Sequence, residues 1–224
     1  MLPVIDGNNH FICIIQSKKL LGVLKETLVT EMQTMVGVSK DERALSSSWF
    51  AVKKRLPWLQ INLLTAFLAA VVVGLFESTI AQYTALAILL PIAAGQSGNT
   101  GVQALAVTMR GLTLREITIR DWFRVIVKEA GAGLINGIVT AFTCGAGVFI
   151  WSQSAGLALI IGLAMISSMI IAAISGVLVP IILKRLGQDP ALSSSIILTT
   201  VTDIAGFMSF LGIATLLSGV LVTS

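Results

Sequence analysis

Charged residues, histidine and cysteine are all scarce in this sequence. Only 12% of its 224 residues are charged, which is about half the usual share for a soluble domain. The single histidine, His10, leaves almost no material for histidine-based catalysis. The two cysteines, Cys13 and Cys144, are too few for a disulfide framework or a four-ligand zinc site. These absences argue against a soluble globular protein and against a disulfide-rich scaffold.

Long apolar runs take the place of the missing charge. Hydrophobic residues make up 55% of the chain, and its mean hydropathy is +0.93, which excludes an intrinsically disordered chain. A membrane-spanning helix needs roughly 20 mostly apolar residues. Such runs occupy residues 57–76, 83–109, 125–151, 155–183 and 192–222. The sequence therefore predicts an all-α integral membrane protein with five transmembrane helices.

The basic residues predict how the chain is oriented. Fourteen of the 15 Lys and Arg fall in the N-terminal segment, in the connection after the second run, or in the connection after the fourth, and Lys128 lies at the start of the third run. The positive-inside rule makes these three places cytoplasmic, so the N-terminus is inside and the C-terminus outside, as five spans require. The four tryptophans lie near the ends of the first and third runs, as in an aromatic belt. The net charge of +4 is then a topology signal and a lipid contact, and no nucleic-acid partner is expected.

The residues before the first span form two further segments. Two short apolar runs flank a turn at Asp6-Gly7-Asn8-Asn9 and precede a helix expected over 18–26. This order resembles the closing half of a CBS domain, so residues 1–26 are interpreted as a remnant of one, without a nucleotide site. Residues 27–48 are expected to form a connecting helix and a polar linker, with a regulatory role or as a plain tether. The chain is either a piece of a longer protein or a naturally short form.

Asp203 is the acid nearest the middle of any predicted span. A carboxylate at this depth costs roughly 2.5–3.5 kcal/mol on insertion scales, and no Lys or Arg lies in the central part of a span. A bound cation, a proton or a water-filled pore must compensate, or the acid is protonated and bonded to a neighbouring helix. Ser195, Thr199, Asp203 and Gly206 share one helical face, and this face is predicted to line a narrow wet path.

The second run holds a polar segment after Pro91, which is expected to interrupt the helix. Gly95 and Gly98 either expose backbone carbonyls or allow tight packing, and the amides, including Asn99, either face a cavity or bond other helices. Carboxylate, hydroxyl and carbonyl oxygens suit hard cations such as Mg²⁺ or Ca²⁺. One Asp per chain supplies only one of the two negative charges that would balance a divalent ion. A two-fold dimer brings a second Asp to its symmetry axis.

Two further features of the third run leave alternatives open. Glu129 follows Lys128 directly, and because adjacent helical residues face poorly, a partner on another helix, such as Arg124, or a residue of a cytosolic loop is expected. Gly133 and Gly137 have the G-x-x-x-G spacing of helix contacts, either within the chain or across a dimer.

Three motifs carry a family resemblance: GQSGNTGVQALAVTMRGL, KEAGAGLINGI and KRLGQDPALSSSIILTTVTDIAGF. Together they resemble the MgtE family of magnesium channels, from about Ser48 to the C-terminus. The family has a cytosolic N domain, a CBS pair and a plug helix, and its pore lies between two subunits. The resemblance makes residues 49–224 a pore domain and Asp203 the pore acid. It also makes Gly95, Gly98 and Thr199 carbonyl donors to the ion, and Asn99 a further site residue or a helix-orienting one.

The predicted function is a homodimeric channel that moves hydrated Mg²⁺ into the cytoplasm through the cell membrane, a bacterial inner or plasma membrane. Mg²⁺ is then the transported ion, and the chain is not an enzyme because it offers no intramembrane nucleophile–base pair. A proton- or sodium-coupled divalent-cation exporter and a non-conducting membrane subunit remain as alternatives.

Overall fold

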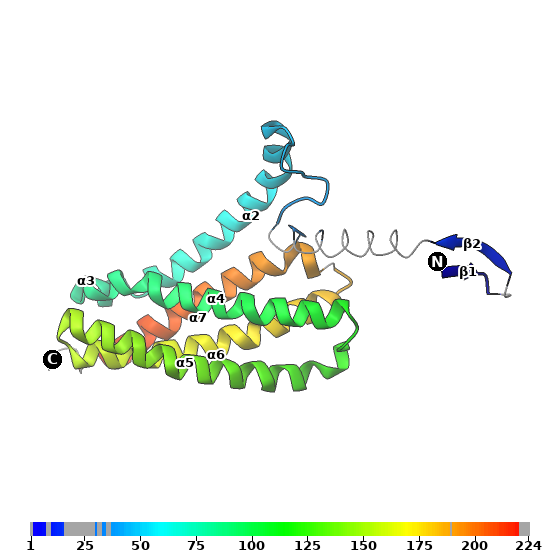
Figure 1. The fold of residues 1–224 in the computed structure, drawn as a ribbon. Coiled ribbons are helices and arrows are strands. Elements are labelled where there is room, and N and C mark those ends of the chain that lie inside the picture. Colours follow the sequence, from blue (N-terminus) through cyan, green and yellow to red (C-terminus); the bar gives the residue numbers. More distant parts are fainter. Residues whose placement is uncertain are drawn as a thin grey trace.

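The computed structural model describes residues 2–7, 10–15, 30, 33–34, 37–188 and 190–219. The helices are α2 (Ser48–Gly74), α3 (Glu77–Gln82), α4 (Ala85–Thr113), the 3-10 turn η1 (Ile119–Asp121), α5 (Trp122–Ser152), α6 (Ala155–Arg185) and α7 (Pro190–Leu216). The helices labelled α4, α5, α6 and α7 lie side by side, and α2 diverges from them (Figure 1). The membrane part is therefore helical, as the sequence predicts.

A hairpin precedes the helices. Strands β1 (Leu2–Ile5) and β2 (Phe11–Ile15) pair antiparallel, and the backbone N–H of Asp6 donates to the carbonyl of His10 at 2.9 Å. The N–H of His10 in turn donates to Oδ1 of Asp6 at 2.7 Å. Both predicted extended runs are strands. The helix expected over 18–26 and most of the connecting helix lie outside the described residues, so the CBS remnant stays a prediction.

Side-chain caps fix where the helices begin. The Ser47 hydroxyl accepts from the N–H of Phe50 at 3.3 Å, and the Ser154 hydroxyl accepts from the N–H of Leu157 at 3.2 Å. Each cap satisfies a donor that has no partner within its helix. Because of the first cap, α2 begins at Ser48, well before the apolar run predicted from residue 57, and so includes Lys53, Lys54 and Arg55.

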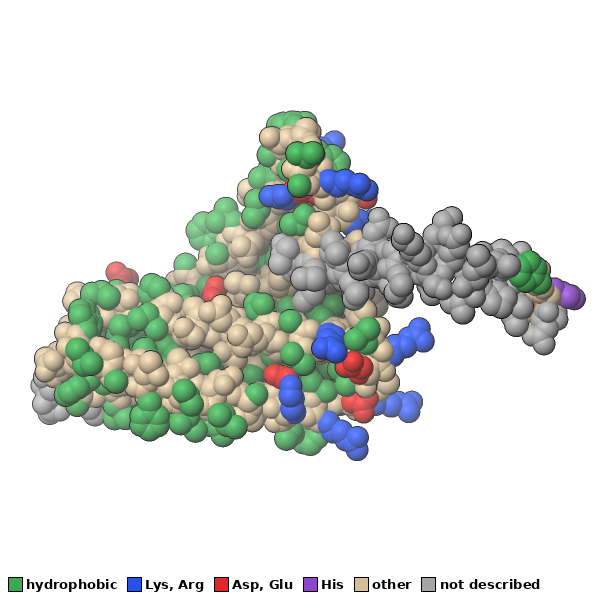
Figure 2. All heavy atoms as spheres, in the orientation of Figure 1, with side chains coloured by type: hydrophobic (Ala, Val, Ile, Leu, Met, Phe, Trp, Pro, Cys, Tyr) green, Lys and Arg blue, Asp and Glu red, His purple; other side chains and the backbone are tan. Residues whose placement is uncertain are grey.

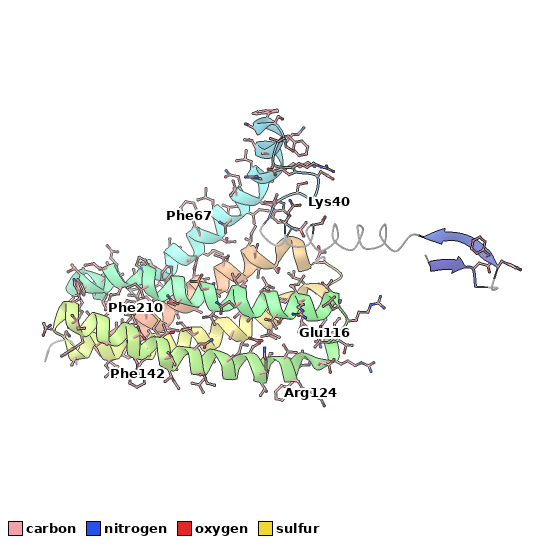
Figure 3. The ribbon with its side chains drawn as sticks, in the orientation of Figure 1. Lys40, Phe67, Glu116, Arg124, Phe142 and Phe210 are labelled. Atoms are coloured by element: carbon pink, nitrogen blue, oxygen red, sulfur yellow. The ribbon has the colours of Figure 1, made fainter. Side chains whose placement is uncertain are left out.

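Helix α6 is the centre of the bundle. It packs against α4, α5 and α7, and half of its most apolar window is buried, against 6% of that of α2. The side chain of Phe210 on α7 is completely buried in the core, whereas Phe142 on α5 is 77% exposed and points away from the bundle (Figure 3). The bundle thus has a packed interior and an apolar exterior.

Small residues set the spacing between α5 and α6. A Cβ added at Gly133 would lie 2.9 Å from the carbonyl oxygen of Met169, and one at Gly137 would lie 3.0 Å from the Cα of Ile166. Glycine is needed at both places because the two backbones approach so closely. Of the two contacts left open by the G-x-x-x-G spacing, the structure shows the one within the chain.

Among the described residues, four helices are long and apolar enough to cross a membrane, namely α2, α5 together with η1, α6 and the Ser194–Leu216 part of α7. Helix α4 has 29 residues, about 43 Å at 1.5 Å per residue, and its polar middle lowers its hydropathy. Near the end where α4 is followed by α5, Lys, Arg, Asp and Glu gather on the surface of the bundle (Figure 2).

Candidate functional site

The predicted site residues lie on α4 and α7, which cross closely. The buried hydroxyl of Ser97 on α4 donates to the carbonyl of Thr202 on α7 at 3.0 Å. A Cβ added at Gly101 would lie 2.8 Å from Cγ2 of Thr202. Because Gly98 follows Ser97 and Asp203 follows Thr202, this crossing brings the polar segment of α4 and the acid of α7 to the same level of the bundle.

None of the five predicted ion-site residues is buried in the single chain. Gly95, Asn99 and Thr199 are exposed, while Gly98 and Asp203 are partly exposed. A Cβ added at Gly95 or Gly98 would meet no atom within 4 Å. These residues therefore occupy an uncovered polar face, defined here as Gly95, Gly98, Asn99, Thr199 and Asp203.

The expected break at Pro91 is wrong, because α4 continues through this residue as one helix. Proline is tolerated inside a membrane helix when neighbouring helices support the segment, and α6 and α7 both pack against α4. The carbonyls of Gly95 and Gly98 consequently belong to a continuous helix, without the irregular backbone that the sequence suggested.

Gly206 also differs from expectation. The spacing of α7 places it with Asp203, but Gly206 is buried against α4, where an added Cβ would lie 3.2 Å from the Cα of Ala94. Thr199 and Ser195 lie on the open side, and the Thr199 hydroxyl donates to the Ser195 carbonyl at 2.8 Å. The carbonyl of Thr199 accepts from the Thr202 hydroxyl at 3.0 Å.

The carboxylate of Asp203 has no hydrogen-bond or ion-pair partner among the described residues. Within the same described part of the chain, no three His, Cys, Asp or Glu residues lie close enough together to hold a metal ion. Asp203 is thus a lone half-buried acid on an uncovered face, and the alternative of an acid bonded to a neighbouring helix gains no support.

Glu129 is compensated in a way that the sequence did not predict. It is only 7% exposed, and Nζ of Lys128 donates to its carboxylate. The expected partner on another helix or a cytosolic loop is wrong, because the partner is the adjacent Lys128 of α5, whose side chain stays 63% exposed. Glu129 therefore has a cation of its own, and Asp203 does not.

A cavity of about 390 Å³ opens between α2 and α7 beside the polar face. Its lining comes from the linker (Gly37, Val38), from α2 (Arg55, Trp58, Leu59, Asn62) and from α7 (Ser195, Ile196, Thr199). The sequence pointed to Ser195 and Thr199 but missed the residues of α2. Asn62 carried a usable signal, because a polar side chain inside an apolar span marks function or packing.

The fold and the site together define a class of protein. Long apolar helices surround a packed core, and an acid, a hydroxyl and backbone carbonyls lie together on one uncovered face. Oxygen ligands of this kind suit hard cations, and the class is that of helical integral membrane proteins with an uncovered, oxygen-rich face.

Comparison with known proteins identifies the family within this class. The family model of MgtE, a divalent cation transporter, matches residues 90–213, which is more than half of the chain. The chain is 32% identical to the magnesium transporter MgtE of Thermus thermophilus over 222 residues, covering 97% of the chain and 48% of that protein. With the magnesium transporter MgtE of Bacillus subtilis, identity is 30% over 214 residues, covering 96% and 48%.

The chain therefore belongs to the MgtE family of divalent cation transporters. It spans about half the length of the curated relatives it matches. Membership confirms the predicted family and a multi-pass location in the cell membrane, as in these bacterial relatives. It also confirms that the chain is not an enzyme, since the family consists of ion transporters.

Proposed function

We propose that this chain forms the membrane pathway of a magnesium transporter and moves hydrated Mg²⁺ into the cytoplasm. The observation that carries the proposal is the unpartnered carboxylate of Asp203 on the uncovered polar face of α4 and α7. The magnesium transporters at about 30% identity support the choice of ion. A fixed negative charge without a cation of its own is suited to attract a mobile one.

The membrane topology in this proposal has five spans. Helix α4 is added to the four most apolar helices because its 29 residues exceed the roughly 20 needed and because it packs along α6 and α7. Its residues Gly95, Gly98 and Asn99 lie on an uncovered surface, which is tolerated where a span borders protein or water. The basic ends of α4, α5 and α6 then face the cytoplasm, with the N-terminus inside and the C-terminus outside.

The pathway lies at the axis of a homodimer. In a single chain, the polar face of α4 and α7 would meet lipid, and the carboxylate of Asp203 would pay the full penalty of burial in hydrocarbon. A second copy placed on this face covers it and brings a second Asp203 to the axis. Two carboxylates then balance one divalent ion.

The ligand types favour a hydrated ion. Mg²⁺ gives up its waters reluctantly and is usually held through one or two carboxylates with several waters retained. Backbone carbonyls at Gly95, Gly98 and Thr199 and the amide of Asn99 can accept hydrogen bonds from those waters. The five residues of the polar face are accordingly proposed as the ion site.

The replacement Asp203→Asn tests this proposal. Asn keeps the shape and one acceptor oxygen but removes the charge from both subunits, and each charge attracts a divalent ion by a few kcal/mol at roughly 4–5 Å in a partly wet pore. Since 1.4 kcal/mol changes occupancy tenfold, we expect Mg²⁺ uptake into proteoliposomes to fall by at least about tenfold.

The matched control is Glu129→Gln, which neutralises the other intramembrane acid but leaves the polar face unchanged. Its uptake should stay within about threefold of the parent, because Glu129 lies outside the polar face. A factor of three corresponds to only about 0.65 kcal/mol. Equal uptake by Asp203→Asn and the parent, at equal membrane abundance, would reject the pore-acid proposal. Flux that depends on an imposed proton or sodium gradient would favour the coupled exporter instead.

A further inference from the structure

The cavity between α2 and α7 lies in line with the proposed ion path. Ser195 and Thr199 line it, and they lie two turns and one turn before Asp203 on the same helix. The cavity is therefore reached from Asp203 by moving along α7 toward its first residue, at the basic end of the bundle. Helix α2 closes its other side with Asn62, Trp58 and Arg55.

Arg55 is the only charged residue among the described residues that line this cavity. An arginine is an unfavourable neighbour for a cation path, because its guanidinium carries a permanent positive charge. Lys53 and Lys54 precede it on α2, and Lys40 and Arg43 lie on the linker, but none of these four lines the cavity. The charge of this space is therefore set by Arg55 and by whatever neutralises it.

Glu42 of the linker pairs with Arg55 through two contacts. Nε of Arg55 donates to Oε2 of Glu42 at 3.1 Å, and Nη2 donates to Oε1. The Glu42 side chain is only 6% exposed, while that of Arg55 is 51% exposed. This forked geometry is the strong form of an Arg–carboxylate pair, and it places a negative charge directly behind the one positive charge of the cavity.

We propose that this cavity is the inner vestibule of the ion path and that Glu42 tunes its charge, by neutralising Arg55 so that a divalent cation can occupy the space. The proposal rests on the proposed function and adds to it two residues outside the polar face. Glu42 acts here as a positioning and charge-balancing residue and does not itself touch the ion. Neutralisation of Arg55 matters most for a divalent ion, because an uncompensated positive charge repels a divalent ion twice as strongly as a monovalent one.

Three variants separate charge balance from simple attachment of the linker: Glu42→Gln, Arg55→Gln and the double variant. Glu42→Gln keeps an acceptor for Arg55 but leaves its charge uncompensated, so Mg²⁺ uptake should fall about fivefold at low ionic strength. Arg55→Gln removes the repelling charge but leaves the carboxylate of Glu42, 6% exposed, without a cation, so its uptake is compared at equal membrane abundance and should equal or exceed that of the parent. The double variant should behave like Arg55→Gln.

If the pair only attaches the linker to α2, both single variants break it equally and their uptake should fall together, which would overturn the inference. Raising the ionic strength from about 0.02 M to about 0.5 M should shrink the deficit of Glu42→Gln, because exposed charges are screened. A deficit that is unchanged by salt would also overturn it. Because half of the Arg55 side chain is in solvent, Glu42→Gln leaves no buried unpaired cation and should fold.

The control is Glu116→Gln, which breaks the pair of Arg110 and Glu116, 3.7 Å apart at the basic end but outside the cavity. Its uptake should match that of the parent. The outcomes for the two proposals are distinct. A parent that takes up Mg²⁺, with Glu42→Gln equal to Arg55→Gln, rejects the vestibule alone, whereas a parent without any uptake rejects both.

Discussion

At the scale of single residues, the two intramembrane acids show how position decides what a carboxylate does. Glu129 is 7% exposed and is compensated by Lys128 on the same helix. Asp203 is partly exposed on α7 and has no partner among the described residues. A compensated acid contributes to packing and orientation, while an uncompensated one at this depth requires a mobile ion, water or a proton.

Glycine residues allow the close approach of helices where α4, α6 and α7 meet. A Cβ added at Gly176 on α6 would lie 2.5 Å from the carbonyl oxygen of Gly101 and 2.9 Å from the backbone nitrogen of Leu105. Since both neighbours are backbone atoms of α4, no side-chain rotation can make room. The crossing that holds the polar face in place therefore depends on two glycines on different helices.

Gly176→Ala should destabilise the bundle by about 1–3 kcal/mol, the usual penalty for overpacking a tightly packed site. The thermal midpoint in detergent, followed by size-exclusion fluorescence, should fall. Gly147→Ala is the matched control, because an added Cβ there meets no atom within 4 Å. Its midpoint should stay unchanged or rise, since alanine favours a helix over glycine. Equal midpoints for both variants would contradict the close approach of α4 and α6.

At the scale of helices, α4 differs from the others because one of its faces is packed and the opposite face is uncovered. One face packs on α6 and α7 through Leu86, Ala93, Ser97 and Ala104, all of which are buried. The other face is uncovered and includes the polar segment. Helix α2 has no such packed face and contacts mainly α7, so it borders both the vestibule and the lipid.

The connections between helices give a direct test of orientation. In a variant with Cys13→Ala and Cys144→Ala, a cysteine at Gln153, between α5 and α6, should react with an impermeant maleimide in intact cells. A cysteine at Gln188, before α7, should react only after permeabilisation, because the positive-inside rule places the basic connections in the cytoplasm. Both positions are exposed, so accessibility in the folded chain is matched. The opposite labelling pattern would overturn the proposed orientation.

At the scale of the whole molecule, the uncovered polar face is the main reason to expect a second copy. Polar groups facing hydrocarbon are unfavourable, and Gly95 and Gly98 leave open space where another backbone can approach. The chain's large apolar exterior elsewhere, including Phe142 at 77% exposure, suits lipid.

Paired cysteines test this assembly. With the native cysteines replaced as above, Asn99→Cys should form a crosslinked dimer in membranes, because the two copies of an axial residue lie close together. Phe142→Cys is exposed on α5, away from α4 and α7, and should remain monomeric under the same oxidation. Crosslinking at Phe142 without crosslinking at Asn99 would place the dimer interface elsewhere.

Much of the local structure could be predicted from the sequence, and the reason is physical. Spanning helices need a fixed length of apolar residues, so the runs around α5 and α6 identify those helices nearly to their ends. Asp203 was identifiable for the same reason, since a charge inside an apolar run is conspicuous. The start of α2 was missed because a cap and charged helix-forming residues extend a helix beyond its apolar part.

The sequence by itself determined the class of protein, the apolar runs and the residue types of the candidate ion site, because each of these follows from composition and spacing along one helix. Only the tertiary structure decided which neighbours these residues have. It showed that α4 passes through Pro91 unbroken, that Gly206 packs against Ala94, and that Arg55, paired with Glu42, lines the same cavity as Ser195 and Thr199. Such contacts join segments far apart in the chain, and helical spacing carries no information about which helix will lie opposite.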